Sequence, residues 1–189
     1  MVKLFPIIFV LLWSSAFITT KPIIDYSDPF AALSFRFFFV ALGFFFFSLI
    51  LGNSLKTSGK NIINSILSGV LFHGFYLGGV FYSISIGMPT GVTALIVTLQ
   101  PVLTNILAGP LLKEKIYKSQ WFGMLLGFIG ACLVLGFDIG NSLPIKGVIA
   151  AFISLFAITF STIWQKKIGN STPLSSSNMY QAIGGCLFH

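Results

Sequence analysis

The chain has 189 residues, of which 56% are hydrophobic and 8% are charged, and its formal net charge is +7. Because about a quarter of the residues in an ordinary soluble domain are charged, this composition excludes that class of protein. The positive charge does not indicate nucleic-acid binding, because the lysines lie in short gaps between apolar segments, where they report membrane topology. Cys132 and Cys186 each lie alone inside an apolar segment, so they indicate neither a disulfide framework nor a metal site.

Apolar stretches fill nearly the whole chain and predict membrane-spanning helices. Six are long enough to cross a hydrocarbon core, which takes about 20 helical residues, and the start of a seventh follows them. In lipid the backbone must satisfy its own hydrogen bonds, so we expect each stretch to be helical. The expected fold is an all-α membrane protein, a multi-span helix bundle. The stretches are 4–20, 29–52, 61–87, 91–112, 119–137, 147–164 and 179–189.

Basic residues mark every second gap between these stretches. One set of gaps holds eight of them and the other holds two. By the positive-inside rule, the lysine-rich gaps and the N-terminus are predicted to be cytoplasmic, in a multi-pass protein of the cell (inner) membrane. The lysine-rich set is Lys3, Lys56, Lys60, Lys113, Lys115, Lys118, Lys166 and Lys167, and the other set is Lys21 and Lys146.

The second stretch carries a charge, Arg36, seven residues after Pro29. A charge at this depth is costly and needs a reason. Its long side chain could reach the outer interface or a structural partner. Alternatively, it could face an internal cavity and serve function, and the sequence leaves both interpretations open.

The third stretch carries His73 near its middle, with Tyr76 on the same helix. A buried histidine can be a hydrogen-bonded structural residue or a functional one, and both interpretations remain open. Small residues four positions apart, such as Gly74 and Gly78 or Gly79 and Ser83, predict a close approach to neighbouring helices.

The fourth stretch holds the densest set of polar residues at membrane depth. Pro101 removes one backbone hydrogen bond and frees a carbonyl one turn earlier. In a membrane this break is tolerated beside a partner helix or a wet cavity, so a structural and a functional interpretation both stand. The residues around it become candidates for a cavity: Gln100, Pro101, Thr104 and Asn105.

In the fifth stretch, Gly123 and Gly127 predict close packing against a neighbouring helix.

The residues that follow the fifth stretch suggest a second repeat that does not finish. The spacing of Pro29 and Arg36 recurs in Pro173 and Tyr180, 144 residues later. Five spans separate the two copies, so the second enters the membrane upside down, as in inverted-repeat transporters. The seventh stretch breaks off after about ten residues, which indicates a fragment of a longer protein; a short re-entrant segment is the alternative.

Several chemistries find no support in the sequence. It contains no pair of intramembrane aspartates, no HExxH zinc motif and no phosphate-binding loop. We therefore expect no enzyme, no catalytic or metal-binding residue and no cofactor.

The chain resembles the EamA-like family of the drug/metabolite transporter superfamily. The order and spacing of several short motifs across 1–137 carry this resemblance, and 158–167 is similar to the first helix of a second repeat. The motifs are WSSAF at 13–17, LSFRF at 33–37, GMPTG at 87–91, ALI at 94–96, LQPVLT at 99–104, KEK at 113–115 and QWFG at 120–123.

The resemblance implies ten helices in two inverted five-helix repeats. Residues 1–140 would be the first repeat, and residues 141–189 would be the sixth helix and part of the seventh. It also implies a central cavity that draws on the first, third and fourth spans, which adds Trp13 to the candidates.

The function expected is secondary-active transport, by export or exchange, of small metabolites or amino acids. Its partners would be a small-molecule substrate and the lipid bilayer, not nucleic acid, with a homodimer left open. Because the membrane-embedded polar groups are neutral or cationic, a substrate with an anionic group should be preferred. The alternatives are a small non-transport membrane scaffold and a membrane-embedded lipid-modifying enzyme.

Overall fold

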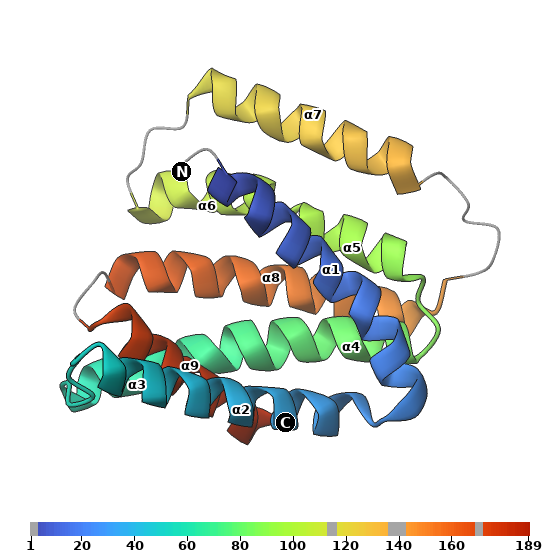
Figure 1. Ribbon diagram of the computed structural model, residues 1–189. Helices are drawn as coiled ribbons and strands as arrows, with labels where there is room; N and C mark the ends of the chain where they lie inside the picture. The colour runs from blue at the N-terminus through green and yellow to red at the C-terminus, as the bar shows by residue number, and fades with distance from the viewer. Residues whose placement is uncertain (1–3, 113–116, 136–142, 169–171) are drawn as a thin grey trace.

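The computed structural model describes residues 4–112, 117–135, 143–168 and 172–189, and every regular element in these ranges is a helix (Figure 1). This confirms the expected all-α fold. The helices are α1 Phe5–Tyr26, α2 Pro29–Ile50, α3 Gly59–Gly69, the π-helical segment η2 Val70–Leu77, α4 Gly78–Ser85, α5 Thr90–Thr98, α6 Gln100–Leu112, α7 Lys118–Leu135, α8 Ile145–Ile168 and α9 Leu174–Phe188.

Five helical segments of the described chain are long and apolar enough to cross a membrane, which agrees with the expected multi-span bundle. They correspond to the first four predicted stretches and the sixth. The segments α3, η2 and α4 form one continuous span, whereas the fourth stretch is divided between α5 and α6 at Leu99. Helix α7 occupies the fifth predicted stretch, and α9 begins at Leu174, before the predicted start of the seventh at Met179.

The connection between α1 and α2 is shorter than the sequence suggests. Helix α1 ends at Tyr26 and not at the predicted Thr20. An ion pair between Lys21 and Asp25, one turn apart, supports these additional turns. Asp28 then caps α2, because its carboxylate accepts hydrogen bonds from two free backbone N–H groups at 3.0 and 2.8 Å.

Helix α8 lies between the α3–α4 span and α5–α6 (Figure 1). Its approach to α4 requires a glycine, because a Cβ atom at Gly79 would lie 2.2 Å from the Ser154 hydroxyl oxygen. The crossing of α3 and α9 is equally close, since a Cβ atom at Gly69 would lie 2.0 Å from the Gln181 carbonyl oxygen. The predicted close packing of the third span is therefore confirmed.

Helix α7 lies outermost in the bundle, next to α5 (Figure 1). A Cβ atom added to Gly123 or Gly127 would have no described atom within 4 Å. The predicted close approach through these glycines is thus wrong for the part of the chain that the structure describes. The pattern is common in membrane helices, and the described chain places no helix against these glycines of α7.

The connections gather at two opposite ends of the bundle, as alternating spans require (Figure 1). At one end, α2 finishes and α3 begins beside the start of α9, where Thr57 and Thr172 share a hydrogen bond of 3.1 Å. At the other end, the Ser83 hydroxyl near the end of α4 donates to the Gly147 carbonyl at the start of α8, at 2.9 Å. Helices α2 and α9 consequently run antiparallel (Figure 1).

Candidate functional site

A cavity of about 300 Å³ lies between α1, α2 and the span that η2 and α4 form. Four of the predicted site residues line it: Trp13 from α1, Arg36 from α2, and His73 and Tyr76 from η2. The rest of the lining is almost entirely apolar and aromatic: Phe9, Leu12, Ala16, Thr20, Phe37, Val40, Phe72, Leu77, Val80 and Phe81.

Arg36 supplies the positive charge of this cavity. Its guanidinium carbon lies 5.9 Å from the centroid of the neighbouring Phe37 ring. Among the residues that the structure describes, Arg36 has no ion-pair partner, because Asp25 pairs with Lys21 and Asp28 caps α2. Its charge is therefore available to a ligand that enters the cavity.

The π-helical segment η2 brings two polar side chains to the cavity wall. In a π-helix the backbone hydrogen bonds reach back five residues, and such segments often occur at functional sites. The His73 ring centroid lies 4.3 Å from that of Phe37 and 5.1 Å from that of Phe72. Its buried Nδ1 has no hydrogen-bond partner in the described chain. Tyr76 is 2% exposed, and its hydroxyl likewise makes no hydrogen bond within the described ranges.

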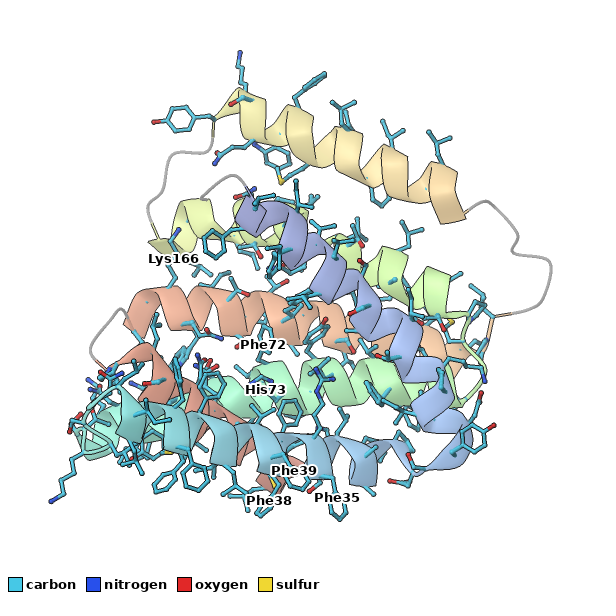
Figure 2. All side chains as sticks on the ribbon, in the orientation of Figure 1. Phe35, Phe38, Phe39, Phe72, His73 and Lys166 are labelled. Atoms are coloured by element: carbon cyan, nitrogen blue, oxygen red, sulfur yellow. The ribbon has the colours of Figure 1, made fainter. Side chains whose placement is uncertain are left out.

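The aromatic residues of α2 divide between two faces. Figure 2 shows Phe35 and Phe38 on the outer side of α2, whereas Phe72 and His73 lie among the helices. Phe35 is 68% exposed, but Phe37 is 3% exposed and forms part of the cavity wall. The outer face suits contact with lipid, and the inner face adds flat apolar surface to the cavity.

The candidates around Pro101 lie outside this cavity. The Gln100 amide nitrogen donates to the Thr104 hydroxyl at 3.0 Å and to Thr162 on α8 at 3.5 Å. The Asn105 amide lies 2.8 Å from the Met124 sulfur on α7, and Pro101 itself is exposed. The polar residues at the break between α5 and α6 therefore contact the neighbouring helices α7 and α8. The structure does not bring these four residues close to Arg36.

Two lining residues carry no sequence signal of their own. Phe37 is one of 22 phenylalanines, and only its place beside Arg36 in the LSFRF motif distinguishes it. Thr20 is 3% exposed, yet its hydroxyl donates to the Ala16 carbonyl within the same helix, at 2.7 Å. In this part of the cavity, only the charge of Arg36 on α2 could be recognised from the sequence as a sign of a functional site.

The chemistry of the cavity is cationic and aromatic. Its described lining contains one guanidinium, one imidazole, one phenol and one indole, and no carboxylate. Within the described ranges, no group of three His, Cys, Asp or Glu residues could hold a metal ion. The arrangement can accept a small molecule with an anionic group and a flat or apolar part, since aromatic faces supply apolar contact and Arg36 supplies charge.

Comparison with known proteins agrees with the membrane-bundle architecture. A family model described as the EamA-like transporter family matches residues 2–136. An uncharacterized transporter, YyaM, from Bacillus subtilis is 27% identical over 183 residues, covering 90% of this chain and 57% of the relative. A probable amino-acid metabolite efflux pump from Salmonella typhimurium is 24% identical over 173 residues, covering 87% of this chain and 53% of the relative.

A third relative, the uncharacterized transporter YvbV from Bacillus subtilis, is 28% identical over 109 residues, covering 58% of this chain and 34% of the relative. The chain thus spans about half the length, or less, of these curated relatives. No solved structure matches the chain significantly.

Proposed function

The chain belongs to the EamA-like transporter family, and from that premise we propose that it acts in secondary-active export or exchange of small metabolites or amino acids. It is a multi-pass membrane protein, and a transporter family implies a small-molecule substrate and not an enzymatic reaction. The proposed location is the cell (inner) membrane with a cytoplasmic N-terminus. The proposed substrate site is the cavity around Arg36.

The single observation that carries this proposal is the charge of Arg36, which has no ion-pair partner among the described residues, in an aromatic cavity between α1, α2 and η2. A charge in a medium of low dielectric interacts strongly with an opposite charge nearby. A carboxylate on the substrate would provide that partner and could also accept hydrogen bonds from the Tyr76 hydroxyl and the Trp13 indole N–H. The name of the Salmonella relative, an amino-acid metabolite efflux pump, is compatible with such a substrate.

We further propose that 1–140 form the first repeat of an inverted pair and that 141–189 begin the second. The antiparallel course of α2 and α9 supports this division, because the second copy of a helix in an inverted repeat enters from the opposite side.

The test compares transport of amino acids with transport of quaternary ammonium compounds by the protein in proteoliposomes. We expect amino acids to be preferred. Arg36→Gln should lower the apparent affinity for them about ten- to a hundredfold, the range for losing one charge-assisted hydrogen bond. His73→Asn should weaken transport through the lost aromatic contact with Phe37.

The matched control is Lys118→Gln, which removes an exposed charge outside the cavity and should leave transport unchanged. A preference for the ammonium compounds, with both cavity substitutions silent, would refute the proposed substrate site.

A further inference from the structure

A second cleft, of about 380 Å³, lies at the end of the bundle where α3 begins and α8 ends. It shares no lining residue with the cavity around Arg36. Two helices that are far apart in sequence build it. Its lining consists of Lys60, Asn61, Asn64, Trp164, Lys167 and Ile168.

The cleft is positively charged and has polar hydrogen-bonding groups. Lys60 lies in the first turn of α3 and Lys167 in the last turn of α8, and both are exposed. Neither has an ion-pair partner among the described residues, and no carboxylate is among those that line the cleft. The Asn64 side chain makes no hydrogen bond in the described chain, so its amide is also free for a ligand.

The position of the cleft matches a membrane–water boundary. Trp164 is 40% exposed and lies about one turn before Lys167, as expected of aromatic residues at the level of the lipid headgroups. Phe160 is 48% exposed and lies one turn further along α8, toward the middle of the span. On α3, Ile63 and Leu67 are 58% and 48% exposed and follow Lys60 at helical spacing. An apolar surface therefore continues from the charged cleft into the region that lipid chains occupy.

We propose that this cleft binds an anionic phospholipid, with the phosphate of the headgroup between Lys60 and Lys167 and an acyl chain along Phe160 and Trp164. Basic pockets between membrane helices bind such headgroups. A soluble anion would use the two lysines, but it would gain nothing from the exposed apolar surface beside them. That surface is what favours a lipid.

The test measures the affinity of the purified protein in a neutral detergent for phosphatidylglycerol by native mass spectrometry, with phosphatidylcholine as the zwitterionic comparison. We expect phosphatidylglycerol to bind more tightly. The double variant Lys60→Gln and Lys167→Gln should lose about twenty-five-fold in affinity, since each lysine near an anionic surface contributes about a fivefold factor. The pair Lys118→Gln and Lys146→Gln removes the same charge outside the cleft and should bind as the wild type does.

The double variant Lys60→Arg and Lys167→Arg keeps both charges, so it should retain binding and remains informative if the glutamine pair does not fold. Unchanged phosphatidylglycerol affinity in the glutamine pair would overturn the proposal. Displacement of the lipid by inorganic phosphate at equal concentration would overturn it too, because the cleft would then be a site for a soluble anion.

Discussion

Tyr76 is the most enclosed polar side chain of the cavity around Arg36. It is 2% exposed, and its hydroxyl has no hydrogen-bond partner within the described chain. Among the described residues, this hydroxyl is not one of the fully buried side-chain atoms that lack a partner, so it is open to the space of the cavity. A structural tyrosine would be expected to pair its hydroxyl, so the unpaired group points to a ligand.

Replacing Tyr76 by Phe separates these two roles. The free energy of unfolding should stay within about 1 kcal/mol of the wild type or rise, because the hydroxyl makes no hydrogen bond within the described chain that the change could remove. The apparent affinity for the transported substrate should fall about tenfold or more, as for loss of a hydrogen bond to a charged group. Thermal unfolding in detergent and transport kinetics measure the two quantities. A destabilised variant with unchanged substrate affinity would show that the hydroxyl is structural.

The sequence was informative for residues whose type is costly in a membrane. Arg36 and His73 stand out because a charge and an imidazole need a reason at that depth. Tyr76 could be added because it is a polar residue on the same helix as His73. Phe37 and Thr20 could not be found, since membrane helices contain many phenylalanines and threonines that bond to their own helix. The sequence also did not predict that Gln100 lies outside the cavity around Arg36, because this depends on which helices are neighbours.

At the scale of elements, glycines decide how closely the helices approach. A Cβ atom at Gly184 on α9 would lie 2.5 Å from the Ile66 carbonyl oxygen on α3. This neighbour is backbone and cannot move without shifting its helix. The small residues of the third span pack closely, whereas Gly123 and Gly127 of α7 face no atom of the described chain within 4 Å of an added Cβ atom. A motif of small residues identifies a helix face that can pack closely. Which helix packs against that face depends on the tertiary structure.

Gly184→Ala should therefore destabilise the protein by about 1–3 kcal/mol, the usual range for overpacking. Gly123→Ala is the matched control, because a Cβ atom there has no described atom within 4 Å. It should be neutral or stabilising by up to about 1 kcal/mol, because alanine favours the helix. Thermal unfolding of both variants in the same detergent measures the difference. Equal stabilities would show that the α3–α9 crossing is looser than the structure indicates.

The molecule as a whole has two unlike ends. At one end, hydrogen bonds connect the segment between α2 and α3 to α9. The Asn53 amide nitrogen donates to the Ser175 hydroxyl at 2.9 Å, and the Tyr180 hydroxyl donates to the Leu55 carbonyl at 2.8 Å. The starts of α3 and α7 and the end of α8 lie at this end (Figure 1). These helix ends carry Lys60, Lys118, Lys166 and Lys167, and Lys56 lies in the connection before α3. The end of α1, with Lys21, and the start of α8, with Lys146, lie at the other end. Lys3, Lys113 and Lys115 lie outside the described residues.

The charge asymmetry predicts which end faces the cytoplasm, and single cysteines can report it in intact cells. In a background with Cys132 and Cys186 replaced by alanine, Gly59→Cys marks the lysine-rich end. A side chain at Gly59 would have no described atom within 4 Å, so the change should be tolerated. Ser27→Cys marks the opposite end, where Ser27 is exposed between α1 and α2.

An impermeant thiol reagent should label Ser27→Cys in intact cells and leave Gly59→Cys unlabelled until the cells are permeabilised. The reason is that an excess of lysine holds short loops on the cytoplasmic side during insertion. Labelling of both after permeabilisation verifies that each thiol is accessible. The reverse pattern in intact cells would place the N-terminus outside. It would also move the cleft between Lys60 and Lys167 to the outer leaflet, where the same phosphatidylglycerol measurement would still decide whether it binds lipid.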